Sequence, residues 1–364
     1  MPALLAAVED VSLDVGRVAL RRLVPLAGPA ERDALRGLLL ELDIGIVGDV
    51  AVALRELHDQ KAPVVAAEGL RSSSTARRQK AALALRELHD PASASTLLCA
   101  LGDEHVPVRR LAVEGLAELP STREIVSACR KALTDRHDSV RAAAVRAIAR
   151  KDSAAAETLR SAAGDRAGSV REALASVSCA LACETVERLL EDRAEKVRVT
   201  ALHALVECPQ RVQLSVLLTR LADESWHVRR AACDSVAAAG GPNAERALIA
   251  GLVDDRLEVR GRALVALERA CGDKLDDVLE KTLPNADSRL RLAVIDILGR
   301  RGRGAVALPY LDDSSPEVRV VAVHALAAGG SAGAEEALLR VQADDPDPTV
   351  RNAAAVALEE LKRH

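Results

Sequence analysis

The sequence has 364 residues and is 49% hydrophobic but only 1% aromatic, with one Trp, one Tyr and no Phe. Rows of rings that stack nucleobases, and aromatic cages for quaternary ammonium ligands, cannot be built from two rings. The 50 Lys and Arg nearly balance the 54 Asp and Glu, and the net charge of −4 argues against a nucleic-acid partner. Because Ala and Leu, the strongest helix formers, must supply the core, the composition favours an all-α fold.

The cysteines and the apolar runs predict the environment of the protein. Seven cysteines are scattered through the chain without any CxxC pair, which is typical of reduced thiols in a reducing compartment. No secretion signal and no apolar run of membrane-spanning length occurs in the sequence. We therefore expect a soluble cytoplasmic protein with no membrane association, and the sequence leaves its oligomeric state open.

Residues 1–90 predict three divergent helical units. The segment Leu-Arg-Glu-Leu-His-Asp at residues 54–59 is repeated unchanged 31 residues later, at residues 85–90. Another step of 31 residues back from Leu54 reaches Leu23, in the stretch Ala19-Leu20-Arg21-Arg22-Leu23. Self-similarity at a fixed period of this length indicates a repeat architecture. We expect these units to form an N-terminal cap that continues into the rest of the chain.

Residues 91–364 predict nine regular units, each marked by a Val-Arg pair or the near match Leu290-Arg291, at intervals of 27 to 32 residues. Six residues before each arginine stands an Asp, except for Asn285 before Arg291. The Asp–Arg pairs are Asp103 and Arg109, Asp135 and Arg141, Asp165 and Arg171, Asp192 and Arg198, Asp223 and Arg229, Asp254 and Arg260, Asp313 and Arg319, and Asp345 and Arg351. We expect a structural ladder in which Asp accepts turn amides and an Arg from its own or an adjacent repeat. Repetition in every layer argues against catalysis, which needs a single constellation.

Each unit predicts two short helices joined by a polar turn, as in residues 121–150. Positions three and seven after the arginine are apolar, for example Ala112 and Leu116, which is the spacing of one helix face. The shorter intervals that end at Arg198 and Arg319, of 27 and 28 residues, predict trimmed first helices. No stretch alternates with period two, so no sheet is expected.

Paired helices with Asp in the turn and Val-Arg opening the second helix resemble HEAT repeats. More narrowly, they resemble the short, regular bacterial and archaeal HEAT-like repeats that also occur in phycobilin lyases. The resemblance is strong over residues 92–362 and weak over residues 1–90. It implies a right-handed α-solenoid of about twelve helix pairs, with the second helices on the concave side. Stacking is required because one helix pair cannot bury its apolar face alone.

In a regular solenoid the informative residues are those that vary at a constant repeat position. Positions one and five after the ladder arginine lie away from the core stripe and are expected to face the concave groove. Trp226, the single tryptophan, stands in an inter-helix turn and belongs to a residue type enriched at interface hot spots. A solvated helix face, or for Trp226 a plug between turns, is the alternative. The candidate partner-binding residues are Trp226, His227, Arg230, Asp234, His203, Asp296 and His324.

No metal or cofactor site is expected from the sequence. His58 and His89, and also His105 and His137, are one repeat apart, but a metal site needs three or four convergent ligands. The Cys179 and Cys183 side chains are four residues apart without a further ligand at a suitable spacing, so they are expected to pack in the core.

The resulting main hypothesis is a non-enzymatic scaffold that presents a concave groove to a protein or peptide partner. No GxSxG, P-loop, HExxH or dinucleotide fingerprint occurs, although enzyme function stays open. One alternative is a HEAT-like lyase or other enzyme that acts on a bound chromophore or cofactor. The other is binding of a nucleic-acid phosphate backbone by two basic clusters, which are Arg71, Arg77, Arg78 and Lys80, and Arg300, Arg301 and Arg303.

Overall fold

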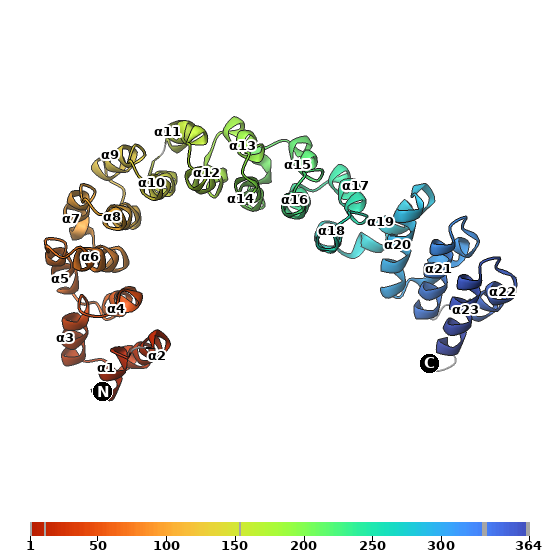
Figure 1. Ribbon diagram of the computed structural model, residues 1–364, viewed down its shortest axis with the longest axis horizontal. Coiled ribbons are helices and arrows are strands. Elements are labelled where there is room, and N and C mark those ends of the chain that lie inside the picture. Colours follow the sequence, from red (N-terminus) through yellow and green to blue (C-terminus); the bar gives the residue numbers. More distant parts are fainter. Residues whose placement is uncertain (1, 11, 153, 330–332, 362–364) are drawn as a thin grey trace. The chain divides into compact units, whose positions relative to one another are not determined.

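The computed structural model describes residues 2–10, 12–152, 154–329 and 333–361 (Figure 1). These residues form α-helices and 3₁₀-helices and contain no strand, which confirms the all-α solenoid. The described helices form twelve successive pairs, each with a first and a second helix. The chain divides into two compact units, residues 1–201 (unit 1) and residues 202–364 (unit 2), which are described separately.

Unit 1 stacks its helix pairs so that the second helices form one row and the first helices another, as Figure 1 shows for α2 to α12. The first helices are α1 (Pro2–Val8), α3 (Pro29–Leu38), α5 (Ala62–Gly69), α7 (Ala94–Ala100), α9 (Arg123–Ala132), α11 (Ala155–Leu159) and α13 (Cys183–Leu190). The second helices are α2 (Leu13–Leu23), α4 (Ile44–Glu56), α6 (Thr75–Leu88), α8 (Val106–Glu118), α10 (Asp138–Lys151) and α12 (Gly168–Ala175). Unit 1 therefore contains the three divergent repeats together with the first regular repeats.

Unit 2 continues the same alternation after α14 (Glu195–Leu205), the second helix in which the division between the units falls. Its first-helix row contains α15 (Leu214–Arg220), α17 (Pro242–Gly251), α19 (Leu275–Thr282), the 3₁₀-helix η8 (Gly304–Asp312) and α22 (Ala334–Asp344). Its second-helix row contains α16 (Trp226–Ala239), α18 (Leu257–Cys271), α20 (Ser288–Arg300), α21 (Pro316–Gly329) and α23 (Pro348–Leu361).

Some second helices begin after a residue whose side chain accepts the free N–H groups of the first turn. In α16 the Ser225 hydroxyl accepts from the His227 N–H at 3.2 Å, and in α20 the Asp287 carboxylate accepts from the Leu290 N–H at 2.8 Å. α23 begins with a proline, whose missing N–H is no loss at this position. Small caps and prolines thus set the starting points of short helices.

The core lies between the two helix rows and is built from the repeated apolar positions. In α8, Val108, Ala112 and Leu116 are fully buried, at one residue before and three and seven residues after Arg109. In α10, Ala144 and Ile148 occupy the same two later positions and are also fully buried. The core stripe expected from the sequence is therefore confirmed. Fully burying such side chains contributes roughly 1.5–3 kcal/mol each for the larger ones.

The two short intervals shorten different helices. The interval that ends at Arg198 leaves the first helix α13 with 8 residues, no fewer than α5 or α7, so the expected trimming is wrong there. The second helix α12 is short instead, with 8 residues where α8 has 13. In the eleventh repeat the first helix is replaced by the 9-residue 3₁₀-helix η8, which contains Pro309. η8 packs tightly on α21 because two glycines face each other. A Cβ at Gly304 would overlap the Ala325 carbonyl oxygen, and a Cβ at Gly329 would lie 2.6 Å from the Gly304 nitrogen.

Candidate interaction surface

A typical ladder arginine binds two successive inter-helix turns, as Arg109 does. Nη1 of Arg109 donates to the Asp103 carbonyl of its own turn at 2.8 Å. Its Nε and Nη2 donate to the Asp135 carboxylate of the next repeat at 2.8 and 3.0 Å. Asp135 Oδ1 also accepts from the His137 N–H at 2.8 Å. The same bridge to the next repeat occurs at Arg78 and Asp103, Arg141 and Asp165, Arg171 and Asp192, Arg229 and Asp254, Arg291 and Asp313, and Arg319 and Asp345.

The ladder lowers the pKa of carboxylates such as Asp165 and Asp254. The guanidinium of Arg141, followed by the backbone N–H of Ala167, lowers the pKa of Asp165, although burial opposes the shift. At Asp254, burial would raise the pKa, but hydrogen bonds from Arg229 and from the Arg256 N–H lower it to about 2. Because both aspartates are held by a guanidinium and by turn amides, their anionic form is stabilised in the fold.

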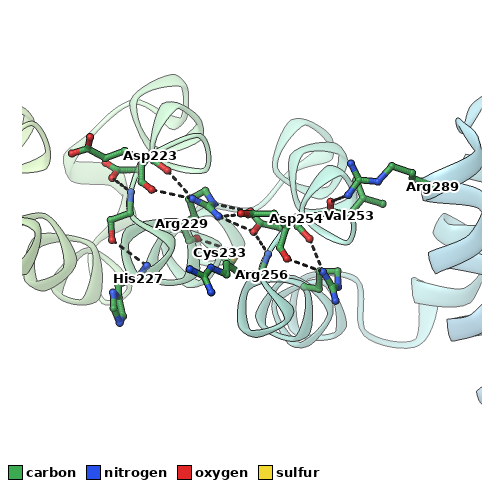
Figure 2. Close-up of polar contacts among 12 residues, drawn as sticks. Asp223, His227, Arg229, Cys233, Val253, Asp254, Arg256 and Arg289 are labelled. Atoms are coloured by element: carbon green, nitrogen blue, oxygen red, sulfur yellow. Dashed lines mark hydrogen bonds and ion pairs between the residues drawn. The ribbon is translucent and has the colours of Figure 1, made fainter.

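Figure 2 shows one complete step of the ladder beside the point where it is interrupted. Arg229 lies between Asp223, whose carbonyl accepts at 3.0 Å, and Asp254, whose carboxylate accepts at 2.7 and 2.9 Å. Arg260 bonds the carbonyls of Asp254 and Asp255 at 2.8 and 3.3 Å. The next repeat has Asn285 at the aspartate position, and over the described residues no carboxylate pairs with Arg260.

Two further Arg–Asp pairs, which the repeat pattern did not predict, connect first helices to the junctions between repeats. Arg36 of α3 donates from Nε to Asp59 at 2.9 Å, and Arg130 of α9 donates from Nε to Asp152 at 2.8 Å. Both aspartates follow the end of a second helix and also accept backbone N–H groups. The available signal was an Asp after a second helix, with a first-helix Arg 22 or 23 residues before it.

The candidate residues of α16 lie along its first three turns. Trp226 is the first residue of the helix rather than a turn residue, and it is half-buried. Its ring stacks on His227 with centroids 3.7 Å apart and an interplanar angle of 28°. Arg230, one turn further on, is exposed. Trp226, His227 and Arg230 therefore form a local exposed group at the N-terminal end of α16.

Asp234 departs from the expectation that it faces a partner. The residue is only 5% exposed, because two arginines of α18 lie over its carboxylate. Arg262 Nη2 is 2.7 Å from Oδ2 and Arg269 Nη1 is 3.6 Å from Oδ1. The sequence shows an arginine, Arg262, two residues after the ladder arginine of the next repeat. Whether the Arg262 side chain reaches Asp234 depends on the packing of α18 against α16.

The remaining candidates are distributed over separate second helices. His203 on α14 and His324 on α21 are exposed. Asp296 on α20 is half-buried and bonds Arg300 of the same helix, with Oδ2 2.7 Å from Nη2. The structure therefore brings together Trp226, His227 and Arg230 on one helix but does not assemble all seven residues into one site.

Unit 2 contains a groove between its second helices α18 and α20, which we name the α18–α20 groove. Its volume is about 480 Å³. These two helices pack less closely on each other than α16 on α18 or α20 on α21, and the groove lies where they separate. Its lining residues are Leu252, Val253, Asp254, Leu257, Arg260, Gly261, Leu264, Arg289, Leu292, Ala293, Asp296, Ile297 and Arg300.

Unit 1 contains a second groove across α6, α8 and α10, with a volume of about 540 Å³. Four of its five charged side chains pair with each other. Arg86 Nη1 is 2.9 Å from Glu114 Oε2, and Arg150 pairs with Glu118. Glu114 and also Arg146 and Ser176, which line this groove, occupy position five of their repeats. The variable positions thus contribute to the recessed surfaces of both units.

Carboxylates neutralise most of the two basic clusters that were considered for phosphate binding. Arg77 pairs with Glu41 at 2.6 Å, and Arg78 pairs with Asp103 at 2.8 Å. In the second cluster Arg300 pairs with Asp296, Arg301 with Asp276 and Glu268, and Arg303 with Glu280.

The cysteines differ in state. Cys99, Cys129, Cys183, Cys233 and Cys271 are free, whereas Cys179 and Cys208 are each disulfide-bonded. The expectation of seven reduced thiols is therefore wrong at two positions. Burial raises the pKa of the Cys129 thiol to about 11 and that of Cys233 to about 12, and buried thiols of this kind are unreactive.

Two further properties of the surface concern ions and membranes. In the described part of the chain, no three His, Cys, Asp or Glu side chains group in a way that could hold a metal ion. Across the same residues, no helix has both the length and the apolar character that crossing a membrane requires.

The ladder, the core stripe and the paired helices agree with the family comparison. A model of HEAT repeats matches residues 94–178, 184–268 and 304–364, which is more than half of the chain. The chain belongs to the HEAT-repeat family. No curated protein sequence matches this HEAT-repeat chain.

Solved structures of karyopherins share the fold of the HEAT-repeat chain. It is similar to Kap121p, with a TM-score of 0.59, 15% identity, and coverage of 92% of this chain and 45% of Kap121p. It is also similar to Kap95p in a structure with RanGDP, with a TM-score of 0.57, 12% identity, and coverage of 99% of this chain and 60% of Kap95p. For Kap121p bound to the extreme C-terminus of the protein phosphatase Cdc14p, the TM-score is 0.54, the identity is 14%, and the coverage is 98% of this chain and 44% of Kap121p. The HEAT-repeat chain spans less than two thirds of each of these proteins, and at these identities the likeness shows the fold alone.

Proposed function

We propose that this HEAT-repeat chain is a non-enzymatic scaffold that binds a protein or peptide partner along its second-helix rows. One observation carries the proposal. The grooves of both units are lined by the repeat positions whose residue type varies, such as Glu114 and Arg146 in unit 1 and Gly261 and Asp296 in unit 2. The core and ladder positions stay nearly constant. Variation confined to a recessed face is what recognition on a repeated framework requires.

The structural neighbours support a protein partner. Kap95p binds RanGDP, and Kap121p binds the extreme C-terminus of the phosphatase Cdc14p, so this architecture can bind both folded proteins and chain termini. The distribution of charge supports the same proposal over the two alternatives. Groove carboxylates such as Glu114 and Asp296 are bonded by arginines, and the basic clusters are largely neutralised by acids.

We propose Trp226, His227 and Arg230 as one contact point on α16. A half-buried ring stacked on an imidazole presents a large rigid surface, and Arg230 stands beside it with its side chain exposed. Tryptophan and arginine are the residue types most enriched among side chains that dominate binding energies.

Site-specific photo-crosslinking tests the proposed function. The amino acid p-benzoylphenylalanine is placed at Val356 on second helix α23, or at Leu339 on the adjacent first helix α22. The two residues are matched, since they are 52% and 51% exposed. In lysate of the native host, we expect a discrete protein crosslink from the Val356 site and from a third site at Val265, and none from the Leu339 site.

The proposed function is wrong if the Leu339 site crosslinks as strongly, or if no second-helix site captures a protein. The contact point on α16 is tested in the same assay by Trp226→Ala combined with Arg230→Ala. This double variant should reduce the yield of the crosslinked partner while the far-UV circular dichroism spectrum stays unchanged. An undiminished yield would remove this contact point from the proposal without affecting the second-helix row as a whole.

A further inference from the structure

We propose that the α18–α20 groove binds a peptide segment in which an Asp or Glu side chain stands beside apolar residues, and that this carboxylate binds Arg260 where the next repeat supplies none. The inference rests on the proposed scaffold function and names the chemistry of the partner at one place.

The interruption of the ladder leaves Arg260 with an incomplete set of partners. In the other described bridges a carboxylate of the next repeat binds the arginine, as Asp254 binds Nε and Nη2 of Arg229. Arg260 uses Nη1 for two carbonyls of its own turn, and the next repeat offers Asn285, whose amide has no charge. Its Nε and Nη2 edge therefore keeps the fork geometry that matches a carboxylate.

A second cation of the groove also has no carboxylate. Arg289 of α20 donates from Nη2 to the Val253 carbonyl at 3.1 Å, as Figure 2 shows, and has no other side-chain bond among the described residues. The acids of the groove are already bonded, Asp254 by Arg229 and Asp296 by Arg300. Two uncompensated guanidinium groups thus give the groove a local positive charge, although the whole chain has a net charge of −4.

The walls between these cations are apolar and open. Leu257, at the start of α18, is 69% exposed, and Leu292 and Ile297 of α20 line the opposite wall. Gly261 lies in the first turns of α18, and a Cβ there would have no atom within 4 Å. A glycine inside a helix destabilises it by roughly 0.5–1 kcal/mol relative to alanine, so its effect here is to widen the groove beside Arg260.

These features favour a peptide over a nucleic-acid backbone. The position that is vacant in the ladder is that of an aspartate, and the walls offer apolar side chains at helix spacing rather than rings for bases. The volume of about 480 Å³ lies in the range of pockets that enclose a few side chains. A carboxylate next to Leu, Ile or Val satisfies both the cations and the walls.

Selection from a random dodecapeptide library displayed on phage, with the full chain as bait, tests the inference. We expect enriched peptides to combine Asp or Glu with neighbouring aliphatic residues. A synthetic copy of an enriched peptide should lose affinity by roughly tenfold or more when its acid is changed to the amide, because a charge-assisted bond is lost.

Four variants of the chain, two of them controls, locate the binding site without unfolding the protein. Asn285→Asp supplies the missing carboxylate within the chain, and it should weaken the peptide by competing for Arg260, whereas Asn285→Ser should not. Gly261→Leu fills the groove with a better helix former and should abolish binding with no loss of thermal stability. Gly37→Leu, at an exposed helix position of unit 1 with an equally open Cβ direction, is the control and should bind as the unmodified chain does.

The inference is overturned if enriched peptides are basic or purely apolar, or if Asn285→Asp and Gly261→Leu bind them unchanged. It is also overturned if a single-stranded oligonucleotide binds the chain and is lost in these variants, which would assign the groove to phosphate. Such a result would not change the expected crosslinking from Val356. The peptide site in the α18–α20 groove and the scaffold function can therefore be disproved independently of each other.

Discussion

Arg229 and Asp254 join two successive repeats of unit 2, with Nε 2.7 Å from Oδ2 and Nη2 2.9 Å from Oδ1. The two side chains are only 13% and 11% exposed. The bond is therefore shielded from water, and it fixes the turn of one repeat against the start of the second helix in the previous one.

Replacing one ladder arginine should destabilise the chain according to whether its carboxylate is present. Arg229→Met leaves Asp254 with an unpaired, largely buried charge, and we expect a loss of roughly 2–4 kcal/mol. Arg260→Met is the matched control, because Arg260 makes the same carbonyl bonds without the carboxylate, and its loss should be below about 1 kcal/mol. Urea unfolding followed by circular dichroism measures both, and equal losses would contradict a role for the inter-repeat pair.

Acid should unfold the chain in a pH window that the ladder sets. The folded-state pKa values of Asp103, Asp135, Asp165 and Asp254 are lowered. Their stabilisation is therefore fully present above the unfolded pKa of about 3.9 and is lost as the pH falls through the folded pKa. For Asp254, with a folded pKa of about 2, the contribution is on the order of 2–3 kcal/mol.

This pH dependence can be measured as the urea midpoint between pH 5 and pH 2, where stability should fall steadily with pH. Arg229→Met should flatten part of this slope, because Asp254 then loses the bond that depresses its pKa. An identical slope in the variant and the unmodified chain would show that the pair does not control acid stability.

Because the Asp234 carboxylate is buried, replacing its partner Arg262 should destabilise the chain more than replacing Asp234 itself. Arg262→Met leaves a carboxylate that is 7% exposed with only the more distant Arg269, and we expect a loss of roughly 2–4 kcal/mol. Asp234→Asn removes the charge itself, and Arg262, which is 33% exposed, can turn to water, so the loss should be smaller. Combining the two changes should recover part of the Arg262→Met loss in thermal unfolding.

Close contact between η8 and α21 should make Gly304 intolerant of a side chain. Gly304→Ala places a methyl group onto the Ala325 carbonyl, and we expect a loss of roughly 1–3 kcal/mol. Gly37→Ala serves as the control, because its Cβ would meet no atom within 4 Å, and it should be neutral or stabilising by roughly 0.5 kcal/mol. Differential scanning calorimetry compares them, and a tolerated Gly304→Ala would show that the 3₁₀ segment can move away from α21.

Sequence periodicity was sufficient to predict the repeat, the helix pairs and the buried stripe of Val108, Ala112 and Leu116. These features depend on local spacing and on burial that every repeat shares. The short intervals showed that a helix would be shortened but not which one, since at the interval ending at Arg198 the second helix α12 is short and the first helix α13 is not. A reduced interval also does not reveal that a 3₁₀-helix will replace an α-helix, as in η8.

The site could be predicted only where it follows the repeat. Asp234 occupies a surface position of its own helix, yet Arg262 and Arg269 of the next helix cover it, and this depends on how two helices pack. The groove depends on the separation of α18 from α20, which no single repeat encodes. The change from Asp to Asn285 was visible in the sequence, but its meaning for Arg260 required knowing that the ladder arginine reaches the next repeat.

The interruption of the ladder at Asn285 should also make unit 2 unfold in two steps rather than in one. In stacked repeats, stability is a sum of each repeat's own term and the coupling to its nearest neighbours. Between the repeat of α18 and the repeat of α20, the coupling lacks both the ion pair of Arg260 and close helix contact. The repeats after α18 are therefore expected to unfold locally as a separate group. Amide hydrogen exchange should therefore show α20, α21 and α23 opening together at a lower free energy than α16 and α18. Asn285→Asp should bring the two exchange classes closer.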